Sequence, residues 1–253
     1  MEEKLIEYYN KFNEDKRLTT KHGQVEFLTG INYIEKYLKK DSKIIDIGAG
    51  TGAYSIYFYD KGYDVTSVEL VKHNLRVIEK KRPDLKAYQG NALNLKFEDN
   101  SFDIVILFGP MYHLMTMEDK INALKEAKRV CKKNGYIFIS YCMNEYAVIT
   151  HGIKDKFMKE AVINKEIDSD FRVTNNLYSF VRIEDIDHIK DTCNLKREVI
   201  LSQDGPAEYL KKEINSMDEE EFNLFMKYHL STCERKELLG AGRHILDILK
   251  KED

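Results

Sequence analysis

The sequence of 253 residues contains no tryptophan and only three prolines. Tryptophan-repeat architectures and proline-rich linkers are therefore not expected. The sequence also has no large excess of charge of one sign. It contains 40 Lys and Arg residues and 43 Asp and Glu residues, which gives a formal net charge of −3. This balance does not suggest a dedicated binder of nucleic acid. The longest apolar runs, such as Ile104 to Phe108, are far shorter than a membrane span, so no membrane partner is expected.

Cysteine is scarce, and its spacing excludes two common motifs. No two cysteines form a C-x-x-C pair, so a zinc ribbon or a thioredoxin-type motif is excluded and no metal site is expected. The first residues, MEEKLIEYYN, lack the apolar centre of a signal peptide. We therefore expect a cytoplasmic protein with reduced thiols. The four cysteines are Cys131, Cys142, Cys193 and Cys233.

Residues 43–143 alternate short apolar runs with amphipathic stretches. The runs at 43–47, 64–68, 85–88, 103–108 and 136–142 predict strands. Helices are predicted at 52–61, at 71–81 and after Thr116, which is followed three residues later by Asp119 in a capping-box-like pattern. Alternation with short connections predicts an α/β fold with a Rossmann-like, doubly wound and mostly parallel sheet of seven strands. Ligands bind such sheets at the carboxyl ends of the strands.

The rest of the chain is more helical. One helix is predicted at 2–12, and a second helix carries Leu28, Ile31, Ile34 and Leu38 on one face. Further helices are predicted at about 153–165 and from Ile183 to Cys193. The 207–239 region is predicted to be mostly helical, with Ser216 and Glu219 as a capping box. A strand-like stretch near 177–181 and a sixth strand at 195–201 are also expected, whereas 243–249 fits a strand or a helix. We expect one domain, with an N-terminal helical lid (1–40), a cofactor-binding core (43–143), an insertion (144–181) and a C-terminal completion with a helical cap (182–253).

A glycine-rich turn lies between the first predicted strand and the helix after it. Gly48-Ala49-Gly50-Thr51-Gly52 lets the backbone approach a ligand closely, and the helix N-terminus adds unpaired N–H groups and a partial positive charge. Glu69 follows at the end of the second strand, where a carboxylate can accept both hydroxyls of a ribose. A tight turn without a ligand is the alternative, but the strand, helix and acid together favour a nucleoside-containing cofactor.

The spacing of the glycines indicates which cofactor. A dinucleotide fingerprint reads G-x-G-x-x-G, whereas here the third glycine comes one residue early and position 53 is Ala. Asp46 lies just before the turn, where a carboxylate is poorly placed beside a pyrophosphate but compatible with a cationic ligand.

Five motifs in order along Lys43 to Ser140 make the sequence resemble the class I S-adenosylmethionine-dependent methyltransferases. They are IIDIGAGTGAYS, SVEL, GNALNLKF, DNSFDIVILFGPMYHL and EAKRVCKKNGYIFIS. The N-terminal block and the G-P-M-Y-H-L run resemble one bacterial subgroup of that family. Asn91 departs from the family's usual Asp, so the resemblance implies an amide contact to the adenine there in place of a carboxylate contact.

The resemblance implies S-adenosylmethionine as cofactor and a role for each matching residue. Asp46 is expected to hold the methionine amino group, the glycine turn to face the methionine part, Glu69 to bind the ribose, and Leu70 to lie against the adenine. Arg17 is expected to pair with the cofactor carboxylate, with an exposed surface arginine as the alternative. The cofactor-binding residues expected from the resemblance are Asp46, Gly48, Ala49, Gly50, Thr51, Gly52, Glu69, Leu70, Asn91, Ala92, Phe108 and Gly109. Side-chain chemistry and position add Arg17 and Tyr9 to this set.

Methyl transfer from a sulfonium is an in-line displacement, which alignment and exclusion of water can accelerate without a dedicated base. His113 is the candidate catalytic base; a histidine that ties the loop to neighbouring backbone is the alternative. Tyr112 is a candidate for shaping the acceptor pocket or facing the sulfonium, and otherwise an aromatic anchor of the loop. Tyr8 and Tyr9 are candidates for an N-terminal lid, with ordinary helix packing as the alternative.

The leading hypothesis is methyl transfer to a small molecule by a monomer or homodimer. The run Gly109 to Tyr112 is not the [D/N]-P-P-[Y/F] motif of enzymes that methylate nucleobase amino groups, which counts against such a substrate. An RNA or protein methyltransferase is the alternative. A nicotinamide-dependent oxidoreductase and a non-catalytic cofactor-binding protein are less favoured, the first because of the glycine spacing.

Overall fold

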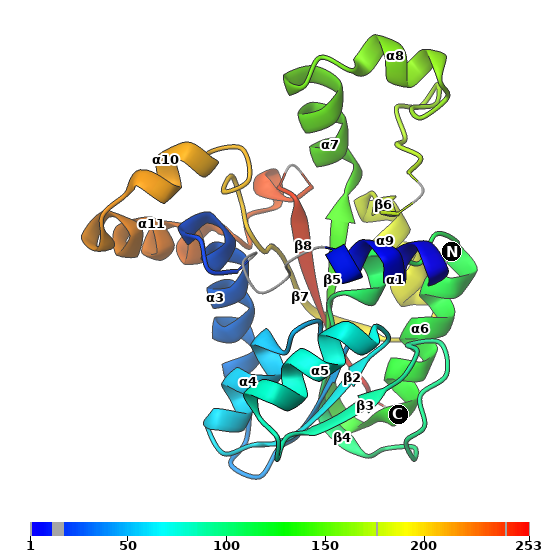
Figure 1. Ribbon diagram of the computed structural model, residues 1–253, viewed down its shortest axis with the longest axis vertical. Helices are drawn as coiled ribbons and strands as arrows, with labels where there is room; N and C mark the ends of the chain where they lie inside the picture. The colour runs from blue at the N-terminus through cyan, green and yellow to red at the C-terminus, as the bar shows by residue number, and fades with distance from the viewer. Residues whose placement is uncertain (1, 12–17, 176, 241, 253) are drawn as a thin grey trace.

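The computed structural model describes residues 2–11, 18–175, 177–240 and 242–252. Its centre is an eight-stranded sheet, in which seven strands follow the order β3-β2-β1-β4-β5-β8-β7 and β6 pairs with β5 (Figure 1). The strands are β1 (Lys43–Ile47), β2 (Asp64–Glu69), β3 (Lys86–Gln89), β4 (Phe102–Leu107), β5 (Cys131–Met143), β6 (Phe180–Val181), β7 (Lys196–Ser202) and β8 (His244–Lys250).

The helices lie between and around these strands. They are α1 (Glu2–Lys11), α3 (Lys21–Glu35), α4 (Ala53–Asp60), α5 (Lys72–Lys81), η1 (Pro110–Tyr112), α6 (Met117–Val130), α7 (Asn144–Ala147), η2 (Val148–Lys154), α8 (Met158–Ile163), α9 (Ile183–Thr192), α10 (Lys211–Ser216), α11 (Glu219–Thr232) and η3 (Lys236–Leu238). No helix in the described ranges combines the length and the apolar character that crossing a bilayer requires.

The predicted parallel sheet is confirmed for its first five strands. β1 pairs in parallel with both β2 and β4, and β4 pairs in parallel with β5. β8 runs antiparallel between β5 and β7, which settles 243–249 as a strand. The expected count of seven strands holds for the main path, and the two-residue β6 is the eighth. The carboxyl ends of β1, β2 and β4 therefore meet at one edge of the sheet.

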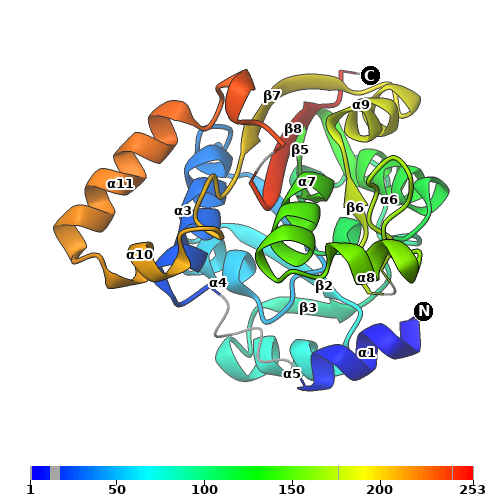
Figure 2. The same cartoon turned by 90° about the horizontal axis from the view of Figure 1, so that it is seen from above.

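Alternating side chains of the strands fill two cores, one on each face of the sheet. Ile45 and Ile47 of β1 belong to the core covered by α6 and α9, whereas Ile44 belongs to the core covered by α3 and α4. Figure 2 shows α6 and α9 on the side of the sheet opposite to α3, α10 and α11. Burial on both faces explains why these strands read as continuous apolar runs.

Two details of the sequence interpretation are wrong. Leu28 was expected on the same face as Ile31 and Ile34, but it is 38% exposed, whereas Ile31 and Ile34 are buried together with Val25 and Thr29. The capping box of α11 is formed by Asp218 and Glu221, not by Ser216 and Glu219, because Ser216 still belongs to α10 and its hydroxyl donates to the backbone of the same helix.

Candidate active site

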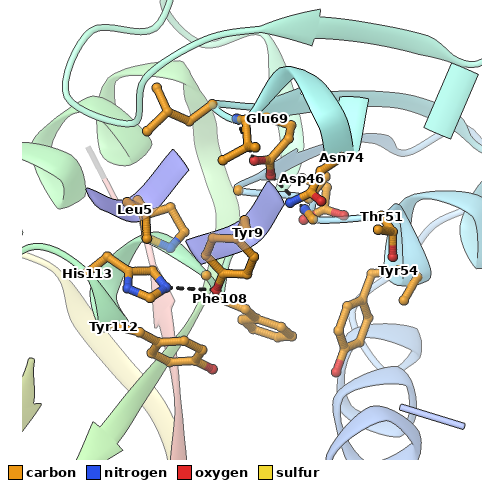
Figure 3. A pocket seen from close by; sticks show the side chains of 18 of the residues that line it. Leu5, Tyr9, Asp46, Thr51, Tyr54, Glu69, Asn74, Phe108, Tyr112 and His113 are labelled. Carbon is orange, nitrogen blue, oxygen red and sulfur yellow. Dashed lines mark hydrogen bonds between the residues drawn. The ribbon is translucent and has the colours of Figure 1, made fainter. Parts of the chain in front are cut away.

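A cavity of about 790 Å³ lies at the carboxyl ends of β1, β2 and β4. This size is within the range of roughly 300–1,000 Å³ that is usual for small-molecule sites. Its walls come from the glycine turn, from the loops after β2, β3 and β4, from α1 and α3, and from residues near 177 and 208 and at the start of β8. Figure 3 shows side chains of these walls converging on one space.

The glycine turn packs tightly against both the end of β2 and the loop after β4. The backbone N–H groups of Gly48 and Ala49 donate to the carbonyl oxygen of Val68, at 2.8 and 3.1 Å. Gly48 has a φ of +74°, and a Cβ added there would lie 2.4 Å from Cδ of Pro110. Both the backbone conformation and the contact therefore require glycine at this position.

Glu69 lies at the end of β2 and is only 5% exposed. Its Oε2 accepts from the backbone N–H of Gly50 and its Oε1 from that of Val71, each at 2.8 Å. Burial raises the pKa of Glu69 to about 7, because losing water disfavours the charged form more than these N–H groups favour it. The carboxylate is thus fixed in orientation at the wall of the cavity.

Asp46 lies beside Glu69 at the end of β1 and accepts a hydrogen bond from Oγ of Ser55 at 2.6 Å. Its complete burial raises its pKa to about 6. Asn74, in the first turn of α5, hydrogen-bonds to Glu69, while its Oδ1 is buried without a partner among the described residues. Figure 3 shows the side chains of Asp46, Glu69 and Asn74 close together.

The cavity brings together most of the residues predicted to bind the cofactor. Gly52 is not among its lining residues; with a φ of +88°, it packs against Ile78 of α5 and Ile56. Arg17 lies outside the described residues. The predicted residues that line the cavity are Tyr9, Asp46, Gly48, Ala49, Gly50, Thr51, Glu69, Leu70, Asn91, Ala92, Phe108 and Gly109, together with Tyr112 and His113.

His113, just after η1, connects two distant segments of the chain. Its Nδ1 lies 2.8 Å from the carbonyl oxygen of Leu177, and its Nε2 lies 2.8 Å from the hydroxyl of Tyr9 in α1. Since a carbonyl only accepts, Nδ1 carries the proton and Nε2 accepts from the Tyr9 hydroxyl. Burial lowers the pKa of His113, which keeps the ring neutral in this arrangement.

Tyrosines complete the wall around His113. The ring of Tyr178 lies 5.1 Å from that of His113, and the Tyr178 hydroxyl donates to Tyr8 at 3.1 Å. The Tyr112 hydroxyl donates to Ser140 at 2.7 Å, and the ring of Tyr112 stacks on that of His244 at 5.1 Å. Tyr112 is thus held at both its hydroxyl and its ring.

A buried ionic cluster borders the aromatic wall. Nδ1 of His244 lies 2.9 Å from a carboxylate oxygen of Asp204 and 3.4 Å from one of Glu26. Burial alone lowers the pKa of His244, but Glu26, Cys142 and Asp204 raise it to about 10. His244 is therefore charged at neutral pH.

Glu208 gathers a second ionic group at the same border. Its carboxylate lies 3.2 Å from Arg243, 2.6 Å from Lys211 and 3.3 Å from the hydroxyl of Tyr146. Burial opposes its ionisation, yet Arg243 and Lys211 lower its pKa to about 2. This border of the cavity therefore carries fixed charges of both signs.

Sequence reasoning missed several of these wall residues. Asn74 lies two residues into a helix that follows the Glu69 strand, and this position alone could have indicated it. Glu26, Glu208 and His244 come from three segments far apart in the sequence, so no local pattern connects them. Tyr178 lies in a stretch that was expected only to be strand-like.

Part of the chain matches a known family, and curated relatives share about half of its length. Residues 45–139 match the family described as "Methyltransferase domain". Demethylmenaquinone methyltransferase of Paenarthrobacter aurescens is 32% identical over 126 residues, which cover 49% of this chain and 48% of that protein. The chain thus spans about half the length of this curated relative.

Two solved structures resemble the fold over nearly the whole chain. A methyltransferase of Thermotoga maritima, described as a possible histamine N-methyltransferase, has a TM-score of 0.63 at 20% identity, covering 99% of this chain and 100% of that one. Geranyl diphosphate C-methyltransferase of Streptomyces coelicolor, crystallised with S-adenosyl-L-homocysteine, has a TM-score of 0.60 at 13% identity, covering 99% and 98%. Residues 45–139 thus match the methyltransferase domain family, and the chain as a whole has the Rossmann-like α/β fold of S-adenosylmethionine-dependent methyltransferases.

Proposed function

We propose that this protein transfers the methyl group of S-adenosylmethionine to a small-molecule acceptor. One observation carries the proposal: the oriented carboxylate of Glu69 and the glycine turn line the same cavity as an aromatic wall and an ionic border. A nucleoside site and a separate acceptor region are thus joined in one enclosed space.

The residues present fit the cofactor. The buried Oδ1 of Asn74 lacks a partner in the described part of the chain, so it suits a hydroxyl or amine donor from a ligand. Glu69 is already oriented by two backbone N–H groups and retains lone pairs for the ribose hydroxyls. When bound, the cofactor supplies an electrophilic methyl group on a positively charged sulfur.

Under this proposal the residues of the chain bind the cofactor and orient it. Asp46, fixed by Ser55, would hold the methionine amino group. Asn91 and Ala92 would border the adenine, and Phe108 with Gly109 would line the methionine end. The tight contact of Gly48 with Pro110 would keep the loop after β4 in place against the methionine.

The acceptor region favours alignment over proton abstraction. Tyr8, Tyr9 and Tyr178 bound the cavity through α1 and the 177–178 loop, which supports exclusion of water from a small acceptor. The lone pair on Nε2 of His113 is engaged by the Tyr9 hydroxyl. We therefore assign His113 a positioning role in this closed arrangement, and its service as a base would require that this hydrogen bond opens first.

The alternatives receive less support. The acids at the border of the cavity are paired with His244, Arg243 and Lys211, so the border offers no coherent basic track for a polyanion such as RNA. The glycine spacing and Asp46 disfavour a nicotinamide dinucleotide. All four cysteines are buried and free, which supports the cytoplasm as the location.

Calorimetric titration with S-adenosylmethionine and S-adenosylhomocysteine tests the proposal. We expect binding to the wild-type chain and a loss of at least about 100-fold in Glu69→Ala, since two hydrogen bonds to a charged group are removed at roughly 1.5–3 kcal/mol each. Glu98→Ala, an exposed change on the loop before β4, is the matched control. Absence of binding at millimolar cofactor, or tight binding of NADH instead, would overturn it.

A further inference from the structure

The segment 177–179 and the loop after β4 are joined directly by two hydrogen bonds. The carbonyl oxygen of Leu177 accepts from Nδ1 of His113 at 2.8 Å, and the backbone N–H of Ser179 donates to the carbonyl oxygen of Tyr112 at 2.6 Å. Leu177, His113 and Tyr112 all line the cavity. The position of this wall of the cavity therefore depends on how firmly the two segments are held together.

Lys120 of α6 joins the same two segments a second time. Its Nζ donates to the carbonyl oxygen of Leu114 and, at 2.7 Å, to Oγ of Ser179. The side chain reaches both partners because α6 begins at Met117, only three residues after Leu114. Lys120 is not among the described residues that line the cavity, so it can act on a ligand only through the residues that it holds.

The burial of this ammonium group is unusual. Lys120 is 2% exposed, although lysine is almost never fully buried without a partner of opposite charge. No carboxylate in the described part of the chain lies within ion-pair distance of its Nζ, and the N-terminal end of a helix disfavours positive charge. An apolar side chain of similar length would avoid these costs, so the hydrogen bonds that Lys120 donates indicate a role that requires them.

The charge of Lys120 also acts on His113. Burial lowers the pKa of Lys120 to about 8, because losing water disfavours the ammonium. Burial lowers the pKa of His113 as well, the hydrogen bond to Leu177 opposes this, and the positive charge of Lys120 lowers it further. Lys120 therefore favours the neutral ring of His113. The groups around Lys120 that oppose the lowering of its pKa are Asp119 of the same helix, Cys142 of β5 and Asp185 of α9.

These contacts form one path from α6 to α1. Lys120 joins the two segments that meet at the Nδ1 hydrogen bond of His113, and the same ring accepts from the Tyr9 hydroxyl at Nε2. We propose that Lys120 is a positioning residue that holds these segments together and thereby keeps His113 in the neutral tautomer with the proton on Nδ1. This role rests on the proposed function only in the assignment of the wall to an acceptor.

Nitrogen-15 NMR of the His113 ring in the ligand-free full chain tests this role, with the resonances identified by their loss in His113→Gln. In the wild type we expect the proton on Nδ1, and an inflection of the ring shifts near pH 8, where Lys120 loses its charge. Lys120→Met keeps the length of the side chain but loses its donors and charge. It should abolish the inflection and raise the population of the other tautomer at least about fivefold, the effect of losing one ordinary hydrogen bond.

A second variant reports on the same contact from the other side. Ser179→Ala removes one of the two acceptors of Lys120 but leaves the ammonium in place. The population of the other tautomer should therefore rise less than in Lys120→Met, and the inflection near pH 8 should remain. The matched control is Lys125→Met, which removes an exposed charge from the same helix and should leave the ring of His113 unchanged.

Cofactor affinity separates a positioning role from general damage to the fold. Calorimetry with S-adenosylhomocysteine should give an affinity within about twofold of the wild type for Lys120→Met, because Lys120 lies away from the residues around Glu69. A wild-type ring without the inflection, an unchanged tautomer in Lys120→Met, or a loss of cofactor affinity in that variant would each contradict the role. Failure of the wild type to bind S-adenosylmethionine would contradict the proposed function alone, because the NMR measurements are made without ligand.

Discussion

The two ends of the cavity are built in different ways. The end that we propose for the cofactor is made by the loops after β1, β2, β3 and β4, and much of it is backbone, with Gly48, Gly50 and the N–H of Val71 around the carboxylate of Glu69. The end that we propose for the acceptor is made by side chains from distant segments, among them Tyr178, Glu26 and His244. Backbone presented by a fixed sheet serves one constant ligand, whereas side chains on separate segments are free to vary with the acceptor.

This comparison predicts that changes at the two ends have separable effects. Damage at the cofactor end should appear mainly in cofactor affinity. Damage at the acceptor end should appear in stability or in the closure of α1.

The largest effect is expected for His244→Gln in the acceptor end. Removing this buried positive charge leaves Asp204 and Glu26 uncompensated, which should lower the free energy of unfolding by about 3–5 kcal/mol at neutral pH. The folded-state pKa of His244 is about 10, above its ordinary value, so its stabilisation is full below about pH 6.5 and is lost as the pH rises through 10. Urea unfolding at several pH values should show this loss in the wild type only. Equal stability of the two proteins at pH 7 would contradict the assignment.

Gly48→Ala, at the end proposed for the cofactor, should have the next largest effect. The Cβ would meet Pro110, so we expect a loss of about 1–2 kcal/mol of stability from the positive φ and at least tenfold weaker cofactor binding, measured by calorimetry. Gly62→Ala is the control, because Gly62 also has a positive φ of +89° but nothing within 4 Å of the added Cβ. Should both variants bind cofactor normally, the turn would not be part of the site.

Cofactor affinity should be about tenfold higher at pH 8 than at pH 6. Under the proposed function the ribose hydroxyls bind the ionised form of Glu69, whose pKa is about 7, so affinity rises as pH rises through 7. The free energy of unfolding of the ligand-free protein should change in the opposite direction. The raised folded-state pKa of Glu69 stabilises the protein at low pH, and this stabilisation is lost as the pH rises through about 7. Glu69→Gln should bind more weakly with a flatter pH profile. A profile identical to that of the wild type would assign the titration to another group.

Tyr9→Phe should have the smallest effect. It removes the donor to Nε2 of His113, a hydrogen bond worth about 1 kcal/mol, and so should raise the open population of α1 about fivefold. Hydrogen exchange of the α1 amides measures this opening, with Tyr228→Phe on the exposed face of α11 as control. Unchanged exchange in α1 would mean that the Tyr9 hydroxyl does not hold the helix in place.

The sequence predicts which residues around Glu69 line the cavity, because these residues follow one another in local order. A strand, a glycine turn, a helix and an acid occur within Lys43 to Glu69, and a parallel sheet brings such consecutive strand ends together. The same reasoning places Asp46 and Phe108 at the cavity, and it fails for Gly52 only because a turn glycine can serve helix packing as well as a ligand.

The acceptor end is not predictable in this way. The contact of Tyr9 with His113, and that of His244 with Glu26, join residues far apart in the chain. Which of them meet depends on how α1, α3 and β8 pack over the strand ends, and periodicity contains no information on that. The helix cap at Asp218 was missed for a simpler reason: two acceptable cap residues, Ser216 and Asp218, lie two positions apart.

The position of β8 also has a kinetic consequence. β8 separates β5 from β7 in the sheet, although residues 144–243 are synthesised between β5 and β8. Until β8 emerges from the ribosome, one edge of β5 stays unpaired and β7 has no neighbour to join. At roughly 5–20 residues per second, that edge remains open for seconds, and an open apolar edge is where a nascent chain aggregates.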